Sequence, residues 1–304
     1  MSEKSINQIV SIANSRGISL TVKREDQLHA EISGNKFRKL KYNVLEAKKQ
    51  GLETLLTFGG AFSNHIAATA AAGKINNLKT VGVIRGDELA KDFQQTIQTN
   101  DTLRSAHENG MQFKFVSRAS YQKKDEKRFL DEIKKEFGDF YLIPEGGTNT
   151  LAIKGCEEIL TLADSDFDYI CVSVGTGGTI AGLINAAKEH QKVLGFSALK
   201  GDFLTQEIEK YTSKSNWNLI AEYHFGGYGK IKPELITFIN QFKDRTNIPL
   251  DPIYTGKMLY GITAMMQTNY FKENSKILAI HTGGLQGIKG MNERLRLKNQ
   301  PLIV

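Results

Sequence analysis

Short runs rich in β-branched residues alternate along this chain with longer segments of helical periodicity. The candidate strands are residues 19–25, 54–58, 79–85, 112–117, 139–144, 169–175, 192–199 and 276–283. The segments with apolar residues at helical spacing begin near Phe37, His65, Thr102, Ser120, Thr150, Gly178, Pro233 and Gly256. Because strand–helix–strand units join parallel strands through crossover helices, this alternation predicts an α/β protein with mostly parallel sheets.

Four glycine-rich loops each follow a candidate strand and precede a helical segment. Their sequences are TFGGAFSNH, PEGGTN, SVGTGGTIAG and HTGGLQG. In open parallel sheets, ligands bind at the carboxyl ends of the strands, near the beginnings of helices. Free backbone N–H groups at such a helix start bind anions without a charged side chain. The sequence therefore predicts a ligand site built from these loops.

Composition narrows the classes of protein and partner. The 304 residues suggest one large or two medium domains, and the net charge of +7 favours anionic ligands such as phosphates and carboxylates. The basic residues alternate with acidic ones, as in residues 123–136, which is typical of a solvated helix face rather than of nucleic-acid binding. Cys156 and Cys171 have neither CxxC spacing nor a neighbouring histidine, so neither a disulfide nor a metal site is indicated. Without a signal sequence or a long apolar run, we expect a cytoplasmic protein that does not enter the membrane.

The strongest phosphate-binding signal is Gly175-Thr176-Gly177-Gly178-Thr179. This segment joins an apolar strand to a helix that opens with Ile180 and Ala181. It is not a Walker loop, because no Gly-Lys-Ser/Thr follows, and it is not GxGxxG. An ordinary tight turn between strand and helix is the alternative interpretation of this loop.

Two further segments carry candidate catalytic groups. In GNKFRKLKY (34–42), Asn35 suits a helix N-cap, and a surface helix is the alternative to a reactive Lys36. A lysine that forms an imine needs its neutral form, which the adjacent cations Arg38 and Lys39 would favour. In GGAFSNH (59–65), a hydroxyl and free N–H groups at a helix start suit a substrate carboxylate.

Read together, the motifs resemble one family. They are KRED (23–26), GNKFRKLKY (34–42), FGGAFSNH (58–65), PEGGTN (144–149), VGTGGTIAGL (174–183), GGYG (226–229), DPIYTGK (251–257) and HTGG (281–284). Their order along the chain is that of the fold-type II pyridoxal-phosphate enzymes of the 1-aminocyclopropane-1-carboxylate deaminase and D-cysteine desulfhydrase family. The resemblance implies a tryptophan synthase β-like fold of two α/β domains, with pyridoxal 5'-phosphate in the cleft between them. It implies a large cofactor-binding domain of 1–37 and 149–304, and a small inserted domain of 38–148.

The resemblance also implies roles for individual residues. Lys36 matches the Schiff-base lysine and general base, and Ser63, Tyr228 and Tyr254 match the other catalytic side chains. The implied cofactor ligands are Lys36, Lys39, Asn64, Gly175, Thr176, Gly177, Gly178, Thr179, Thr255 and Thr282. The implied substrate contacts are Ser63, Asn64 and His65, and no metal is implied. Thr255 would face the pyridine nitrogen, which should stay largely unprotonated because we expect no anion there to stabilise its protonated form.

Two positions distinguish the possible substrates within this family. The ring-opening deaminases carry Glu after the tyrosine of DPxY and Leu in the HTGG stretch, whereas this chain has Thr255 and Thr282. That pattern resembles the D-cysteine desulfhydrases and implies elimination of D-cysteine to pyruvate, ammonia and hydrogen sulfide. We also expect a homodimer. Deamination of the cyclopropane acid, or elimination on another small D- or L-amino acid, is the alternative. A catalytically silent cofactor- or nucleotide-binding protein is the alternative from another class.

Overall fold

A computed structural model of the chain describes residues 5–201 and 203–304, which divide into two compact units. The first unit is Met1–Arg38 with Ile153–Val304, and the second is Lys39–Ala152. The inserted domain expected from the sequence, 38–148, begins one residue earlier and ends four residues earlier than the second unit. We propose that the first unit is the cofactor-binding domain and the second the inserted one.

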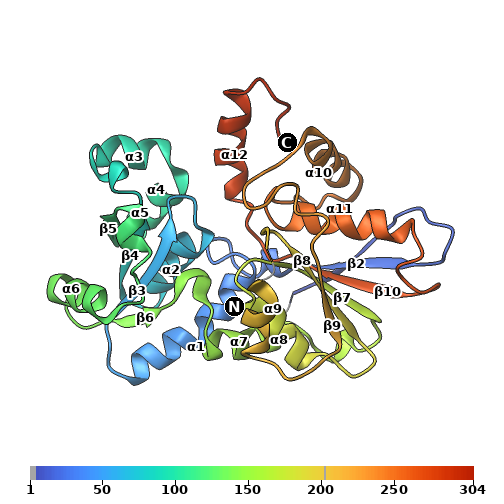
Figure 1. The fold of residues 1–304 in the computed structure, drawn as a ribbon, viewed down its shortest axis with the longest axis horizontal. Helices are drawn as coiled ribbons and strands as arrows, with labels where there is room; N and C mark the ends of the chain where they lie inside the picture. The colour runs from blue at the N-terminus through green and yellow to red at the C-terminus, as the bar shows by residue number, and fades with distance from the viewer. Residues whose placement is uncertain (1–4, 202) are drawn as a thin grey trace. The chain divides into compact units, whose positions relative to one another are not determined.

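The first unit contains a six-stranded sheet in the order β1-β2-β10-β7-β8-β9 (Figure 1). Its strands are β1 (Asn7–Val10), β2 (Ser19–Lys23), β7 (Tyr169–Val174), β8 (Lys192–Ser197), β9 (Trp217–Ile220) and β10 (Lys276–Ile280). β1 pairs antiparallel with β2, and the other neighbours are parallel. The prediction of mostly parallel sheets is confirmed, whereas the short strands β1 and β9 were not expected from the sequence.

Both faces of this sheet are covered, which explains the continuous apolar run of β7. All six β7 residues are buried. Ile170 and Val172 join a core with residues of α8 (Gly178–Ala186) and α9 (Phe203–Glu209), whereas Cys171 joins one with α10 (Pro233–Thr246) and α11 (Thr255–Met266). Because successive strand residues point to opposite faces, a strand covered on both sides needs apolar residues at every position.

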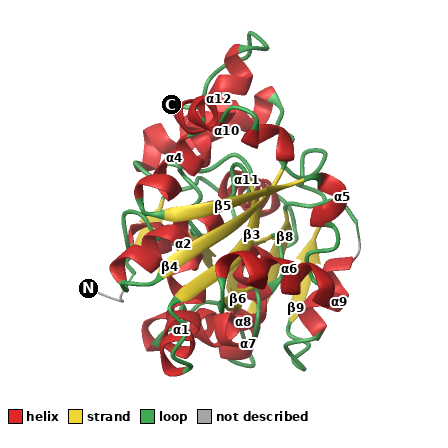
Figure 2. Cartoon of the chain, turned by 90° about the vertical axis from the view of Figure 1, so that its left-hand side faces the viewer, coloured by secondary structure: helices red, strands yellow, loops and turns green. Residues whose placement is uncertain are grey.

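The second unit contains a four-stranded parallel sheet in the order β5-β4-β3-β6, whose strands lie side by side in Figure 2. Its strands are β3 (Thr54–Gly60), β4 (Lys79–Arg85), β5 (Met111–Val116) and β6 (Tyr141–Ile143). Side chains of α2 (Asn64–Ile75) and α4 (Asp101–Glu108) form the core on one face, and α5 (Arg118–Tyr121) and α6 (Lys127–Phe137) contribute to the core on the other. This sheet presents the carboxyl end of β3 to the start of α2.

The remaining helices complete the two units. They are α1 (Asn35–Lys49), α3 (Phe93–Thr99), α7 (Thr150–Glu157) and α12 (Gly287–Arg296), with 3-10 turns at Glu25–Gln27, Asp87–Ala90, Glu145–Gly147 and Leu162–Asp164. None of the helices in the described ranges combines the length and the apolar character needed to cross a membrane.

Both cysteines of the chain should be unreactive in the folded protein. Cys156 and Cys171 are free and buried, and burial raises the pKa of the Cys171 thiol because it disfavours the thiolate. We therefore expect no rapid reaction with Ellman's reagent in buffer, and reaction of both thiols in denaturant. A thiol that reacts rapidly in buffer would contradict the buried positions.

Candidate active site

The loop after β7 forms a candidate phosphate site in the first unit. Gly175, Thr176 and Gly177 connect the end of β7 to α8, and Gly177 is the helix N-cap with a left-handed φ of 81°. The first N–H groups of an α-helix have no partners within the helix, and together with the helix dipole they bind phosphate groups. The predicted loop thus has the backbone form that an anion site requires.

Lys36 is the second residue of α1, and the first residue of that helix, Asn35, contacts this loop. The Asn35 side-chain amide donates to the Thr179 hydroxyl at 2.8 Å, and the Asn35 backbone N–H donates to the Thr282 carbonyl at 3.3 Å. Asn35 therefore bonds to the phosphate loop through the side chain that the sequence suggested as a cap. Gly34 allows the approach, because a Cβ there would lie 1.9 Å from the Thr282 carbonyl oxygen. The first unit brings half-buried Lys36 to the loop 175–179.

The two cations that closely follow Lys36 in sequence, Arg38 and Lys39, each have hydrogen-bonding partners of their own. The Arg38 guanidinium donates to both carboxylate oxygens of Glu25, at 2.9 and 3.1 Å, and both side chains are buried. The Lys39 ammonium lies in the second unit and donates to the Gly146 carbonyl at 3.1 Å and to the Thr148 hydroxyl at 3.0 Å. The charge of Arg38 is thus balanced by an anion, and its expected influence on Lys36 is correspondingly reduced.

Two tyrosines adjoin the phosphate loop. Tyr254 is the N-cap residue of α11, and a Cβ built on Gly175 would lie 3.2 Å from its hydroxyl oxygen. The Tyr228 ring meets the Tyr254 ring edge to face, with 6.2 Å between the ring centroids. A larger residue at position 175 would press on the Tyr254 ring. The structure therefore groups both predicted tyrosines with the loop.

The Thr255 hydroxyl is bound to a carboxylate that sequence reasoning did not single out. Thr255 is fully buried, and its hydroxyl donates to the Asp251 carboxylate at 2.6 Å and accepts the Asp251 N–H at 3.0 Å. The backbone N–H groups of Ile253, Tyr254 and Thr255 also donate to that carboxylate. The expectation that no anion lies beside Thr255 is therefore wrong. Because its one hydrogen is committed to Asp251, Thr255 presents only a lone pair to any further group.

Thr282 lies at the carboxyl end of β10, in the loop that contacts Gly34. Its hydroxyl is 3.2 Å from the Ser173 hydroxyl, and both side chains are buried. Thr282 is therefore already paired within the first unit. Its partner, Ser173, lies on β7, the strand that leads into the phosphate loop.

The predicted carboxylate-binding residues stand at the start of α2 in the second unit. Ser63 is the N-cap residue, with no capping hydrogen bond from its side chain, and Asn64 is the first helical residue. Both are half-buried. A helix N-terminus with a hydroxyl and an amide side chain suits a carboxylate.

His65 is a buried residue of the second unit that hydrogen-bonds to Thr57. It is 2% exposed, and its Nε2 is 2.8 Å from the Thr57 hydroxyl. Because Thr57 donates its hydrogen to the Ile143 carbonyl, His65 Nε2 must be the donor in this pair. A Cβ on Gly147 would lie 2.8 Å from the His65 ring. We therefore leave His65 out of the proposed substrate contacts.

The family of the chain follows from comparison with known proteins. A family model described as pyridoxal-phosphate dependent enzyme matches residues 6–283. The chain belongs to this family. The predicted cofactor, pyridoxal phosphate, and the predicted fold-type II architecture are thereby confirmed.

Individual relatives within the pyridoxal-phosphate dependent family carry two kinds of name. A bifunctional D-cysteine desulfhydrase/1-aminocyclopropane-1-carboxylate deaminase of Arabidopsis thaliana is 33% identical over 90% of this chain and 74% of its own length. A D-cysteine desulfhydrase of Klebsiella pneumoniae is 26% identical over 88% and 87%. A crystal structure of an ACC deaminase homologue matches with a TM-score of 0.80 and 27% identity, covering 97% of this chain and 94% of that one.

The residues of the first unit fit the family's cofactor. Pyridoxal phosphate needs an anion site for its phosphate and a lysine for its aldehyde. The start of α8 offers the first, and Asn35, bonded to Thr179, brings the neighbouring Lys36 to it. The donor set is therefore suited to this pyridoxal-phosphate dependent enzyme.

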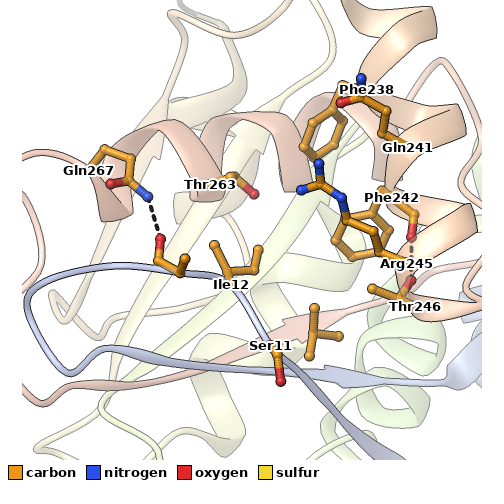
Figure 3. Close-up of a pocket in the computed structure, with 11 residues that line it drawn as sticks. Ser11, Ile12, Phe238, Gln241, Phe242, Arg245, Thr246, Thr263 and Gln267 are labelled. Atoms are coloured by element: carbon orange, nitrogen blue, oxygen red, sulfur yellow. Dashed lines mark hydrogen bonds between the residues drawn. The ribbon is translucent and has the colours of Figure 1, made fainter.

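A separate pocket of about 230 Å³ lies elsewhere in the first unit (Figure 3). The loop after β1 lines it together with α10 and α11, including Ile12, Phe238, Arg245 and Thr263. None of the predicted site residues lines this pocket, and we assign it no part in the reaction.

Proposed function

We propose that this pyridoxal-phosphate dependent enzyme eliminates hydrogen sulfide from D-cysteine. The balanced reaction is D-cysteine plus water to pyruvate, ammonia and hydrogen sulfide. Bound pyridoxal phosphate supplies an electron-withdrawing ring that stabilises negative charge at the substrate's α-carbon. The protein's own groups must hold the substrate and move its protons.

In this proposal, the first unit supplies the groups that hold the cofactor and transfer protons. The Lys36 amine would hold the cofactor in the resting enzyme and would then act as the base for the proton on the substrate's α-carbon. The backbone of Gly175–Gly178 and the Thr179 hydroxyl bind the phosphate. Tyr254, with Tyr228 beside it, donates a proton to the sulfur that leaves the β-carbon. The edge-to-face contact of the two rings supports a shared role.

The second unit supplies the carboxylate site in this proposal. The Ser63 hydroxyl and the N–H groups at the start of α2 bind the substrate carboxylate and fix the direction of the α-proton. As the family resemblance implies, Asn64 would bind the 3'-oxygen of pyridoxal phosphate and Lys39 would contribute positive charge for its phosphate. The Ser63 side chain makes no capping hydrogen bond to α2, which supports this assignment.

The observation that carries the choice of substrate is the neutral residue after Tyr254. Thr255 replaces the Glu of the ring-opening deaminases, and its hydroxyl is held by Asp251. A thiolate leaves readily, whereas opening a cyclopropane requires breaking a carbon–carbon bond and places a greater demand on the electron sink. The Thr255 and Thr282 hydroxyls both have hydrogen-bonding partners within the protein, so neither would be left unpaired against an apolar substrate ring. The leaving group therefore supports D-cysteine.

The substrate proposal predicts a ratio of rates. We expect kcat/KM for D-cysteine to exceed that for 1-aminocyclopropane-1-carboxylate by at least about tenfold, or some 1.4 kcal/mol in transition-state stabilisation. The measurement is 2-oxo acid formation from D-cysteine, L-cysteine, D-serine and the cyclopropane acid under one set of conditions. A preference for the cyclopropane acid would overturn the interpretation of Thr255.

The cyclopropane acid is the second candidate substrate, and the relatives' names support it. The Arabidopsis thaliana relative is named for both activities. The same proton-transfer groups would then give 2-oxobutanoate and ammonia from 1-aminocyclopropane-1-carboxylate. The side-by-side kinetics above separate the two candidates.

We further propose that the enzyme acts in the cytoplasm as a homodimer. The absence of a membrane-spanning helix among the described residues is compatible with this location. Fractionation of cells and analytical ultracentrifugation of the purified holoenzyme test the two parts of this proposal separately.

A further inference from the structure

Lys257 is a buried lysine in the first turn of α11, three residues after Tyr254. It is 2% exposed, and its ammonium donates to the backbone carbonyls of His224 and Gly227, each at 2.8 Å. Those carbonyls lie about 30 residues earlier in the chain, in the loop that carries Tyr228. The first turn of α11 thus begins at Tyr254, and its Lys257 donates to the backbone of the loop that carries Tyr228.

The loop of residues 224–229 has a backbone that needs external support. Phe225, Gly226, Gly227 and Gly229 all have positive φ, at 55°, 96°, 107° and 64°. Left-handed backbone is uncommon for a non-glycine residue such as Phe225, and glycines lose much conformational freedom when they are ordered. Tyr228 itself is 53% exposed, so burial of its ring anchors the loop only in part.

Other contacts of the loop are mostly local. The Gly227 N–H donates to the His224 carbonyl, and the Gly226 N–H donates to His224 Nδ1. These bonds shape the turn without attaching it to another element. The Phe225 ring packs against Tyr260 of α11, with 5.0 Å between the centroids. Attachment to α11 is therefore shared between two aromatic contacts, Phe225 with Tyr260 and Tyr228 with Tyr254, and the ammonium of Lys257.

We propose that Lys257 is a positioning residue that holds the 224–229 loop so that Tyr228 stays beside Tyr254. This role rests on and deepens the proposed function, in which Tyr254, with Tyr228 beside it, protonates the leaving sulfur. Lys257 acts through the loop backbone and touches neither substrate nor cofactor. Its two hydrogen bonds would be lost together if the side chain were replaced by an apolar one.

The two hydrogen bonds from Lys257 to the loop should depend on pH, because the charge of Lys257 does. Burial lowers the pKa of the Lys257 ammonium to about 8, and the Asp251 carboxylate opposes this shift. Other polar groups near the loop include the His224 ring, the Tyr228 and Tyr254 hydroxyls, Lys200, Lys230 and Arg294 of α12. The Arg294 guanidinium would lie 3.8 Å from a Cβ on Gly229. Above pH 8 the neutral amine keeps two N–H donors but loses the charge that strengthens them. The loop should therefore loosen, without detaching, as the pH rises through this range.

The test compares Lys257→Met with Lys214→Met in the holoenzyme. Lys214 also donates to two backbone carbonyls, those of Asn185 and Ala187 at 2.8 and 2.7 Å, but it is exposed and its partners are distant in sequence from the tyrosine loop. We expect Lys257→Met to raise hydrogen–deuterium exchange in residues 224–229 and to lower kcat with D-cysteine by about 10- to 100-fold, with KM changed by less than about threefold. Lys214→Met should change none of the three: exchange in residues 224–229, kcat or KM.

A second comparison, of exchange at two pH values, tests the effect of the Lys257 charge. After correction for intrinsic exchange chemistry, exchange of the wild-type loop should increase between pH 7 and pH 9, and the Lys257→Met loop should lack this increase. If Lys257→Met fails to fold, Gly227→Ala replaces it, because alanine disfavours the φ of 107° and disturbs the loop while Lys257 remains. Gly227→Ala should loosen the loop and lower kcat in the same way.

Two results would overturn the proposal. One is equal protection of the 224–229 loop in wild type and Lys257→Met, and the other is a looser loop with unchanged kcat in either loop variant. Failure of the proposed function has a different signature, since the wild-type holoenzyme would then not form pyruvate from D-cysteine. In that case kcat is measured with whichever of the other three amino acids is turned over, and the exchange comparison still decides whether Lys257 anchors the loop.

Discussion

Lys36→Ala should lower kcat/KM by at least about 1000-fold, because a general base alone contributes some 10²–10⁴ and the covalent link to the cofactor is lost as well. Borohydride reduction of the wild-type holoenzyme should leave the reduced cofactor on the peptide that contains Lys36. The phosphate can still bind at the start of α8, so the variant should retain some affinity for the cofactor.

Lys49→Ala is the matched control for this experiment. Lys49 lies on the same helix as Lys36, and its side chain is 79% exposed. This variant should keep wild-type rates and wild-type labelling. Wild-type turnover by Lys36→Ala, or reduced cofactor attached to a different lysine, would contradict the assignment of Lys36.

Arg38→Met should destabilise the folded protein by about 3–5 kcal/mol, because it leaves a buried carboxylate without its cation. Arg38 and Glu25 are 3% and 0% exposed, and two N–H···O bonds join them. Urea unfolding of the purified protein measures the change through the midpoint at constant slope. Arg38→Met combined with Glu25→Leu should recover most of the loss, since removal of both partners leaves no unpaired charge.

Arg128→Met provides a control on an exposed ion pair. Arg128 and Glu132 lie one turn apart on α6, with side chains that are 89% and 60% exposed. Such a pair contributes less than about 1 kcal/mol, so this variant should unfold almost as the wild type does. If Arg38→Met and Arg128→Met lowered the free energy of unfolding by similar amounts, burial would not set the strength of the Arg38–Glu25 pair.

The sequence by itself determined the class of fold and the family. The apolar period of each strand and the glycine-rich loops after them are local properties, and β4 occupies the predicted residues 79–85. The motifs that identify the family are short, ordered segments, so they too can be read without coordinates. The strands β1 and β9, of four residues each, were not predicted, whereas β6, of three residues, was found within the longer predicted run 139–144.

The tertiary structure decided which side chains are partners. Thr255 was expected to stand without an anion, but the turn at the start of α11 folds the Asp251 carboxylate back onto its hydroxyl. Arg38 was expected to act on Lys36, but Glu25 neutralises it. The bond from Lys257 to the tyrosine loop joins residues 30 and 33 positions apart. Hydrogen bonds and ion pairs depend on distances of about 3 Å, which periodicity and motif spacing do not specify.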